Sequence, residues 1–321
     1  MTESPRVSVI IPALNAANVI VETLESLRAQ TFQDFEAIIV DDGSTDATAE
    51  IARRFCESDP RFLLFQQSHG GTPVARNTAI EKSRGEWIAF LDADDVWLPQ
   101  KLERQMTLSA EDPRVDFLFS NYYFWDVQRD SSTVYYRDHR PLPDGNALRQ
   151  LIFGDVYRTS TVMVRRQTLW DVGLFDPALK FSQDWDLWLR IAKRGICAKG
   201  LRQPLVRYRR WPGSCTVADR FSSSKYHVQV LEKFYRETPD PTSRVLCRRS
   251  LNFARGRIEL FYARQALERN PDAVSASIWR AWQCYPQRLK WLMWLALVLW
   301  PKFLGGNATR KIVHQKLVQK F

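Results

Sequence analysis

The sequence predicts an α/β protein with a doubly wound, mostly parallel sheet, followed by a smaller all-α region at the C-terminus. Short apolar runs alternate with segments of helical spacing in the N-terminal part, and from about residue 221 the spacing is helical throughout. The 321 residues are 45% hydrophobic and 26% charged, which is typical of a globular protein and excludes a disordered chain, a collagen and a coiled-coil rod. We therefore expect an α/β domain over residues 1–218 and a helical region over residues 219–321.

Four apolar runs are expected to form strands: residues 7–11, 38–40, 62–65 and 87–91. Such near-continuous runs are typical of strands that are buried on both faces. The helical segments between them span residues 19–28, 47–55 and 74–82. Thr72 followed by Pro73 predicts an N-cap residue and a proline at the first position of the third helix. This alternation favours a parallel sheet, which binds ligands beyond the carboxyl ends of its strands.

Acidic residues follow the second and fourth predicted strands, as the turns Asp41–Asp46 and Asp92–Asp95. The carboxyl ends of parallel strands meet at one rim of a sheet, so these carboxylates repel one another unless a cation or hydrogen-bond donors compensate them. Oxygen ligands in the pattern Asp-x-Asp suit Mg²⁺ or Mn²⁺ that bridges to phosphates. Each turn alone is also typical of a helix N-cap or a solvated loop, but the coincidence of two turns at strand ends favours a site.

A further carboxylate, Asp184, stands at the start of an apolar helical segment with Leu187, Trp188 and Ile191. Aspartate in this place is typical of a helix N-cap. It is equally suited to act as a general base that takes a proton from a substrate hydroxyl. The spacing of the residues does not choose between the two interpretations.

Five segments, in this order, resemble the inverting glycosyltransferases of family 2, which have the GT-A fold. They are VSVIIPALN (residues 7–15), IVDDGSTD (39–46), ARN (75–77), GEWIAFLDADD (85–95) and GLFDPALKFSQDWDLWLR (173–190). The resemblance extends over about residues 6–216. It implies a Rossmann-like GT-A catalytic domain that moves a sugar from a nucleotide-sugar donor, foremost a UDP-sugar, to a hydroxyl of a glycan or lipid-linked acceptor, with Mg²⁺ or Mn²⁺ as the cofactor.

The resemblance also implies roles for residues of the donor site. Asp42 matches the carboxylate that accepts a hydrogen bond from the nucleotide base, in a pocket lined by Pro12, Leu14 and Asn15. Asp92 and Asp94 match the family's DxD motif, in which the first carboxylate faces the ribose and the metal and the second holds the metal on the diphosphate.

Other positions match the border of the donor site and the catalytic base. Arg76 and Asn77 lie next to the nucleotide, and Arg76 contacts either phosphate or sugar or an internal carboxylate. Asp184 matches the catalytic base, although Gln183 stands where relatives have a glutamate. Arg209 belongs to a segment that resembles the loop closing over the donor, where it either pairs with phosphate or is solvated.

The C-terminal region carries most of the net charge of +10, because eight Lys or Arg and no acidic residue follow residue 272. Residues 288–304 combine basic flanks with an apolar centre. At 1.5 Å per residue, the roughly 21 Å of its apolar part is too short to cross the ~30 Å core of a bilayer. It is expected either to rest in the membrane interface or to be a buried terminal helix. The first interpretation places the protein on the cytoplasmic face of the inner membrane as a peripheral protein.

Two other function classes fit parts of the sequence. A catalytically silent nucleotide-sugar-binding protein needs Asp42 and Asp92 but no base, and Asp184 argues against it. A nucleic-acid binder would use the basic tail, but no RNA-binding or DNA-binding module is visible, so no nucleic-acid partner is expected. The five cysteines show neither a C-x-x-C pair nor an even count, and the N-terminus does not resemble a signal peptide, which together indicate a reducing, cytoplasmic compartment.

Overall fold

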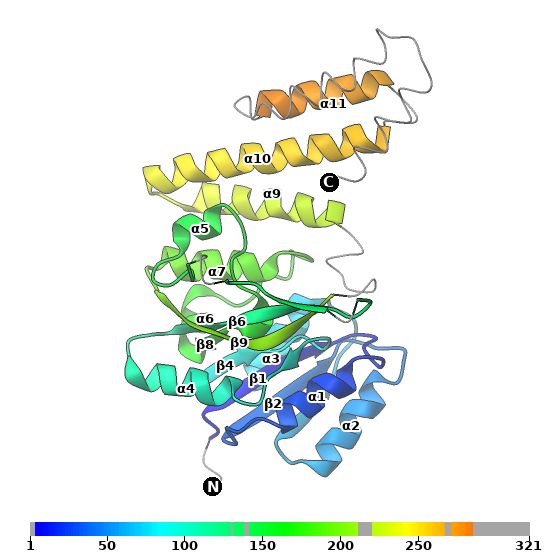
Figure 1. The fold of residues 1–321 in the computed structure, drawn as a ribbon, viewed down its shortest axis with the longest axis vertical. Helices are drawn as coiled ribbons and strands as arrows, with labels where there is room; N and C mark the ends of the chain where they lie inside the picture. The colour runs from blue at the N-terminus through cyan, green and yellow to red at the C-terminus, as the bar shows by residue number, and fades with distance from the viewer. Residues whose placement is uncertain (1–3, 130, 138–140, 211–219, 267–270, 285–321) are drawn as a thin grey trace. The chain divides into compact units, whose positions relative to one another are not determined.

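The computed structural model describes residues 4–129, 131–137, 141–210, 220–266 and 271–284. The chain divides into two compact units, Met1–Asp219 and Arg220–Phe321. The first unit combines a sheet with helices and the second is helical, as Figure 1 shows for each. The expected α/β fold with a helical C-terminal region is confirmed.

The strands of the first unit are β1 (Val7–Ala13), β2 (Phe35–Asp41), β3 (Phe62–Gln66), β4 (Trp87–Phe90), β5 (Val96–Trp97), β6 (Phe117–Asp126), β7 (Ser131–Val134), β8 (Met163–Arg165) and β9 (Ala198–Arg210). Its helices are α1 (Ile20–Arg28), α2 (Thr48–Ser58), α3 (Thr72–Lys82), α4 (Lys101–Glu111), α5 (Leu148–Ile152), the 3-10 helix η1 (Thr159–Thr161), α6 (Arg166–Val172) and α7 (Gln183–Lys193). The four predicted strands correspond to β1, β2, β3 and β4, and the three predicted helices to α1, α2 and α3.

The sheet has the strand order β3-β2-β1-β4-β8-β6-β9-β5, with β7 paired to β6. The strands β1 to β4 are all parallel. Beyond β4 the sheet becomes mixed, because β8 is antiparallel to both of its neighbours and β5 and β7 run antiparallel to β9 and β6. β6 and β9 pair in parallel. The carboxyl ends of β1, β2 and β4 therefore lie side by side at one rim.

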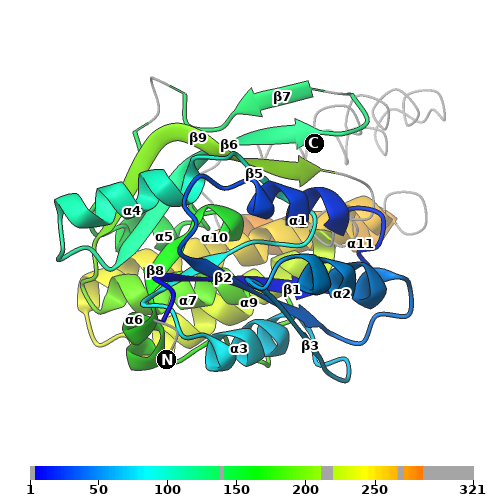
Figure 2. The same cartoon turned by 90° about the horizontal axis from the view of Figure 1, so that it is seen from below.

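The side chains of β1 alternate between two apolar layers, as the period of two in a strand requires. Val7, Val9 and Ile11 belong to a core cluster that includes Leu24 of α1 and Phe55 of α2. Figure 2 shows α1 and α2 on one face of this part of the sheet and α3 on the other. Because both faces are covered, the strand is buried almost throughout, which explains its continuous apolar sequence.

The start of α3 differs from the prediction that Thr72 is its N-cap. Thr72 is already helical, and the cap residue is Gly71, whose φ of 90° lies in the left-handed region that favours glycine. Pro73 stands in the first turn, where its missing N–H costs no hydrogen bond. The prediction was wrong by one residue because it did not consider Gly70 and Gly71, the two glycines before Thr72, as possible cap residues.

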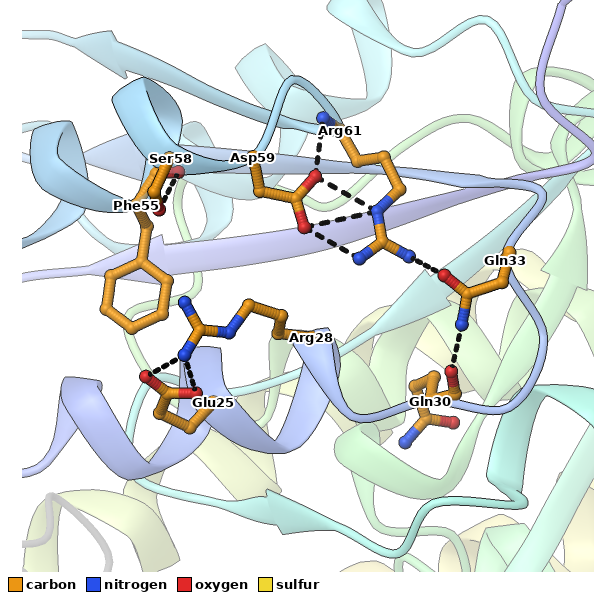
Figure 3. Close-up of polar contacts among 8 residues, drawn as sticks. All are labelled: Glu25, Arg28, Gln30, Gln33, Phe55, Ser58, Asp59 and Arg61. Carbon is orange, nitrogen blue, oxygen red and sulfur yellow. Dashed lines mark hydrogen bonds and ion pairs between the residues drawn. The ribbon is translucent and has the colours of Figure 1, made fainter.

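The loops that lead into β2 and β3 are joined at the end of the sheet where these strands begin (Figure 3). Arg61 forms an ion pair with Asp59 at 2.6 Å and donates to Gln33 at 2.6 Å. Its guanidinium also lies 4.5 Å from the ring centroid of Phe35. The hydrogen bonds from Arg61 hold the pKa of Asp59 below its ordinary value. This cluster stabilises the amino ends of the strands, opposite the rim that carries the acidic turns.

The second unit contains α9 (Arg220–Glu237), α10 (Pro241–Ala266) and α11 (Pro271–Cys284). Its described interior includes Leu231, Cys247 and Ile278. Ion pairs link α9 to α10, through Glu232 and Arg255, and α10 to α11, through Glu259 and Arg280. Among the described residues, no helix is long and apolar enough to span a membrane. The segment 288–304 lies outside the described residues.

Candidate active site

The rim formed by β1, β2 and β4 gathers the predicted donor-site residues. The Asn15 side chain accepts a hydrogen bond from the Thr45 N–H at 2.9 Å, and the backbone N–H of Asn15 donates to the hydroxyl of Ser44 at 2.9 Å. Asn15 therefore fastens the end of β1 to the turn after β2. Pro12 is half-buried in β1, whereas Leu14 is 43% exposed and available to a ligand.

The carboxylate of Asp42 is buried and surrounded by donors from the loop before α3. Its Oδ1 accepts from Gln67 Nε2 at 2.7 Å and from Gly70 N at 2.9 Å. Its Oδ2 accepts from Gly71 N at 2.8 Å and lies 2.8 Å from Nδ1 of His69. Four partners fill the lone-pair capacity of a carboxylate. Asp42 thus organises this loop, and the His69 side chain, which is 62% exposed, occupies a contact that a base N–H could take over.

Arg76 contacts an internal carboxylate, one of the two alternatives that the sequence left open. Its Nη2 lies 2.5 Å from Asp92 Oδ1, and its guanidinium lies 5.2 Å from the ring centroid of Phe175. Its Nε and Nη1 are buried and have no hydrogen-bond partner among the described residues. Asn77 exchanges hydrogen bonds of 2.8 and 2.9 Å with the backbone of Phe175. Arg76 and Asn77 therefore brace the loop before α7 against the rim.

The turn Asp92–Asp95 is anchored by its last carboxylate. Asp95 is fully buried, and it accepts from the Ser160 hydroxyl at 2.5 Å and from the Arg209 N–H at 2.9 Å. Burial and the neighbouring Asp94 and Asp92 raise the pKa of Asp95 well above its ordinary value. Asp95 is accordingly a buried support of the turn.

Arg209 lies against the same turn. Its guanidinium donates from Nε to the backbone oxygen of Asp94 at 2.7 Å and forms an ion pair with Glu22. It stacks 4.2 Å from the ring centroid of Trp125, and only 6% of the residue is exposed. Of the two roles expected from the sequence, the solvated one is wrong, because β9 carries Arg209 into the interior behind the acidic turn.

Asp184 lies in the first turn of α7, two residues after the N-cap residue Ser182. It is therefore not the N-cap. Its Oδ1 accepts from the Trp185 N–H at 2.9 Å, and its Oδ2 accepts from the Thr159 hydroxyl at 2.7 Å. The side chain of the preceding residue, Gln183, is buried, and its Oε1 has no partner among the described residues.

The 3-10 helix η1 joins the acidic turn to Asp184. Thr159 donates to Asp184, and its neighbour Ser160 donates to Asp95 and accepts from the Asp92 N–H at 3.1 Å. The backbone oxygens of η1 are held by Trp97 Nε1 and Gln105 Nε2 at 2.9 and 3.0 Å. Sequence reasoning missed η1, and the only signal was the run of small hydroxyl residues Thr159–Thr161. The carboxylates of Asp95 and Asp184, which are 89 residues apart in sequence, thus bond to adjacent residues.

A second carboxylate lies near Asp184. Burial and the charge of Asp184 raise the pKa of Asp155 to about 8, while Arg158 opposes the rise. Arg158 Nη1 lies 3.4 Å from Asp155 Oδ2, and its guanidinium lies 5.5 Å from the ring centroid of Tyr208. Neither Asp155 nor Arg158 was singled out from the sequence, because no motif marks them.

The acidic turn supplies the ligands expected for a divalent ion. Asp92 and Asp94 offer hard oxygen ligands on one turn. Arg209 of β9 holds the backbone of this turn through its hydrogen bond to the Asp94 oxygen. Within the described part of the chain, no group of three or more His, Cys, Asp or Glu side chains forms a ready cation cage. The residues fit Mg²⁺ or Mn²⁺ bound through one or two carboxylates plus the phosphates of a ligand, which is the usual mode for Mg²⁺ at nucleotides.

Comparison with known proteins finds a matching family model and similar sequences. The family model described as Glycosyl transferase family 2 matches residues 8–173. The chain is 34% identical over 237 residues to TuaG of Bacillus subtilis, named as a teichuronic acid biosynthesis glycosyltransferase, with 73% of this chain and 88% of that protein covered. It is 32% identical over 208 residues to the amylovoran biosynthesis glycosyltransferase AmsB of Erwinia amylovora, with 63% of this chain and 68% of that protein covered.

Two solved structures share the fold. S. aureus TarS 1-349 in complex with UDP-GlcNAc superposes with a TM-score of 0.67 at 19% identity, covering 98% of this chain and 92% of that chain. The mannosyltransferase PcManGT from Pyrobaculum calidifontis, in complex with GDP-Man and Mn²⁺, gives a TM-score of 0.60 at 23% identity, covering 97% of this chain and 84% of that chain. At these identities the likeness concerns the fold alone, which is that of the GT-A transferases.

Proposed function

The chain belongs to glycosyl transferase family 2, and from this premise we propose that it transfers a sugar from a UDP-sugar to a hydroxyl of a cell-envelope glycan precursor, with inversion at the anomeric carbon. One observation carries the proposal. The acidic turn that suits a diphosphate-bound metal and the carboxylate Asp184 are bonded to the adjacent residues Ser160 and Thr159. A donor bound at the turn therefore has a base close to its sugar.

Asp184 is the general base in this proposal. It takes the proton of the acceptor hydroxyl, whose oxygen attacks the anomeric carbon from the face opposite the leaving diphosphate. A single displacement inverts the configuration and needs no carboxylate nucleophile. An α-linked donor then gives a β-linked product, and NMR of the product checks this directly.

The donor occupies the rim in the following way. The nucleotide base of the donor lies against Pro12, Leu14 and Asn15 beside Asp42. An N–H of that nucleotide base replaces the contact between Asp42 and His69. Nε and Nη1 of Arg76 are buried and have no hydrogen-bond partner among the described residues. Since buried N–H groups are rarely left unpaired, they donate to an oxygen of the sugar nucleotide. Arg209 acts through the backbone of the turn.

Asp92 and Asp94 would hold Mg²⁺ or Mn²⁺, which would supply positive charge to offset that of the departing diphosphate. The complex of PcManGT with GDP-Man and Mn²⁺ supports a divalent cofactor, and the TarS complex supports a UDP-sugar.

The names of two relatives support the proposed acceptor. TuaG and AmsB are named for the biosynthesis of teichuronic acid and amylovoran, which supports a glycan or lipid-linked acceptor of the cell envelope. We place the protein on the cytoplasmic face of the membrane, with residues 288–304 at the interface. Flotation with anionic vesicles tests this, because a chain truncated after Asn270 should remain unbound while the full chain floats. Equal behaviour of the two chains contradicts the membrane assignment.

The catalytic assignment is tested with Asp184→Asn and a matched control, Asp186→Asn, on the same helix. Asp186 is paired with Arg190 at 2.9 Å and is assigned no part in the reaction. UDP release from UDP-sugars is measured with a cell-envelope glycan fraction as acceptor. The first variant should lose turnover by ~10² to 10⁴-fold while retaining UDP binding, and the second should lose mainly thermal stability. A loss below about fivefold in Asp184→Asn contradicts the general-base role that we assign to this residue.

The choice of nucleotide is tested by thermal shift with UDP, GDP and dTDP, each with and without Mn²⁺. The largest stabilisation is expected from UDP with Mn²⁺. A larger shift with GDP or dTDP would overturn the UDP assignment and leave the transferase assignment standing.

A further inference from the structure

Two neighbouring hydroxyl groups of η1 link Asp184 to the acidic turn Asp92–Asp95. Thr159 Oγ1 donates to Asp184 Oδ2 at 2.7 Å. Ser160 Oγ donates to Asp95 Oδ2 at 2.5 Å and accepts from Asp92 N at 3.1 Å. Both residues are at least 95% buried. Their hydroxyls are therefore occupied inside the protein and are not offered to a ligand.

We propose that Thr159 and Ser160 are positioning residues that fix the base Asp184 and the metal-binding turn relative to each other, and so set the reach between the acceptor hydroxyl and the donor diphosphate. The inference rests on the proposed function, because it takes Asp184 as the base and Asp92 and Asp94 as the metal ligands. It adds two residues that neither hold the donor nor move a proton.

The frame of η1 is rigid enough for this role. The Ser160 oxygen accepts from the indole N–H of Trp97, and the Thr161 oxygen accepts from the Gln105 side chain. Gln105 is in turn oriented by the Lys101 ammonium group, which lies 2.7 Å from its Oε1 in a fully buried position. The N–H of Phe90, the last residue of β4, donates to the oxygen of Val162 directly after η1. A shift of η1 would disturb these contacts together.

The Thr159 hydroxyl orients the base. One oxygen of Asp184 accepts a hydrogen bond from the Trp185 N–H, and the other accepts one from the Thr159 hydroxyl. These two hydrogen bonds fix the plane of the carboxylate and the direction of its remaining lone pairs. The charged groups that face Asp184 from the segment before η1 are Asp155 and Arg158. They stay in place when only the Thr159 hydroxyl is removed.

The Ser160 hydroxyl shapes the turn. It binds the first residue of the turn through the Asp92 N–H and the last through the Asp95 carboxylate, so the two ends are held by one oxygen atom. Asp92 and Asp94 then project from a fixed backbone. Partners that orient metal ligands typically contribute 10- to 100-fold to metal affinity or activity.

The two residues are tested separately with Thr159→Val and Ser160→Ala. Thr159→Val keeps the shape of the side chain, and kcat should fall by ~10- to 100-fold, since small misplacement of a reacting group has effects of this size. The KM for the donor should change by less than about twofold, because Thr159 does not contact the donor in this proposal. Thr159→Ser restores the hydroxyl and should recover kcat to within about threefold of wild type.

Ser160→Ala should weaken Mn²⁺-dependent binding of UDP by ~10-fold, measured by calorimetry, while kcat at saturating Mn²⁺ stays within about threefold of wild type. The matched control is Thr161→Val, which removes a buried hydroxyl one residue further on that bonds only the Arg158 backbone at 2.7 Å. It should leave kcat and the Mn²⁺ dependence of UDP binding unchanged. Melting temperatures are measured for every variant, and Thr159→Ala replaces Thr159→Val if the latter does not fold.

The outcomes separate the inference from the proposed function. If Asp184→Asn is active, the base assignment fails. If Asp184→Asn is inactive but Thr159→Val has the kcat of Thr161→Val, the positioning role of Thr159 alone is overturned. If Ser160→Ala binds UDP with Mn²⁺ as wild type does, Ser160 is only a packing residue.

Discussion

A pH-dependent effect on stability is expected at Asp155. Its side chain is 14% exposed, and burial together with the charge of Asp184 raises its pKa from an ordinary 3.8 to about 8. The folded protein therefore retains a proton that the unfolded chain releases above pH 4. Since the folded pKa is raised, the stabilising contribution is fully present below about pH 4 and is lost as the pH rises towards 8. Asp155→Asn removes the titration but keeps an oxygen that accepts from the Tyr157 N–H, a bond of 3.1 Å in the wild type.

The size of the effect follows from the two pKa values. They differ by about 4 pH units (about 8 minus 3.8), and about 1.4 kcal/mol for each unit gives a ceiling of roughly 6 kcal/mol. The free energy of unfolding of Asp155→Asn, relative to wild type, should increase by several kcal/mol between pH 4 and pH 8. Above about pH 9 the difference should be constant.

The assay is urea unfolding of both proteins at each pH from 4 to 9. Asp59→Asn is the matched control, because Arg61 lowers the pKa of Asp59 and the sign is opposite. The stability that Asp59 contributes is present above its unfolded pKa and lost only as the pH falls through the lowered value, so the Asp59→Asn difference should be flat from pH 5 to 9. If the Asp155→Asn difference varies by less than about 1 kcal/mol between pH 4 and 8, the reasoning about Asp155 is refuted.

Three further predictions concern single contacts. Arg209→Lys keeps the charge but loses the Nε bond to Asp94 O, so Mn²⁺-dependent UDP binding measured by calorimetry should weaken by ~10-fold; unchanged affinity would speak against a role in the turn. Gly85→Ala would place a Cβ 2.6 Å from the backbone nitrogen of Ser8, so urea unfolding should show a loss of ~1–3 kcal/mol, and a loss below about 0.5 would contradict the close approach. His69→Ala removes the side chain that competes with a nucleotide base, so UDP should bind about threefold more tightly; weaker binding would mean that His69 itself holds the ligand.

The N-terminal half of the fold was predictable because its signals are local. The apolar runs of β1, β2 and β4 reflect burial on both faces, whereas the edge strand β3 is mostly only partly buried. The rule for carboxyl ends of parallel strands then placed Asp42 and Asp92 at one rim from the sequence alone. The mixed part of the sheet was not predictable in this way. β8 has only three residues, and its pairing with β4 depends on contacts some 75 residues apart in sequence.

The supports of the candidate site were harder to predict than its acids. Thr159 and Ser160 have no motif, and their bonds to Asp184 and Asp95 span 25 and 65 residues. Arg76 shows the same limit, since the sequence allowed a ligand or an internal carboxylate as its partner and only the packing of α3 against the rim placed it on Asp92. The type of a residue determines which chemistry its side chain can perform, but tertiary packing determines whether that side chain contacts a ligand or the protein.

The pairing of the arginines gives a physical reason for the proposed divalent ion. Arg76 faces Asp92, and Arg209 faces Glu22. Each of these two guanidinium groups already compensates the charge of a carboxylate, so a nucleoside diphosphate, even with a hydrogen bond from Arg76, would add negative charge that these arginines do not offset. A hard cation held by Asp92 and Asp94 would offset that charge without breaking either ion pair. The ion pairs would then hold the acidic turn in shape, and the proposed metal would supply the positive charge that the diphosphate requires.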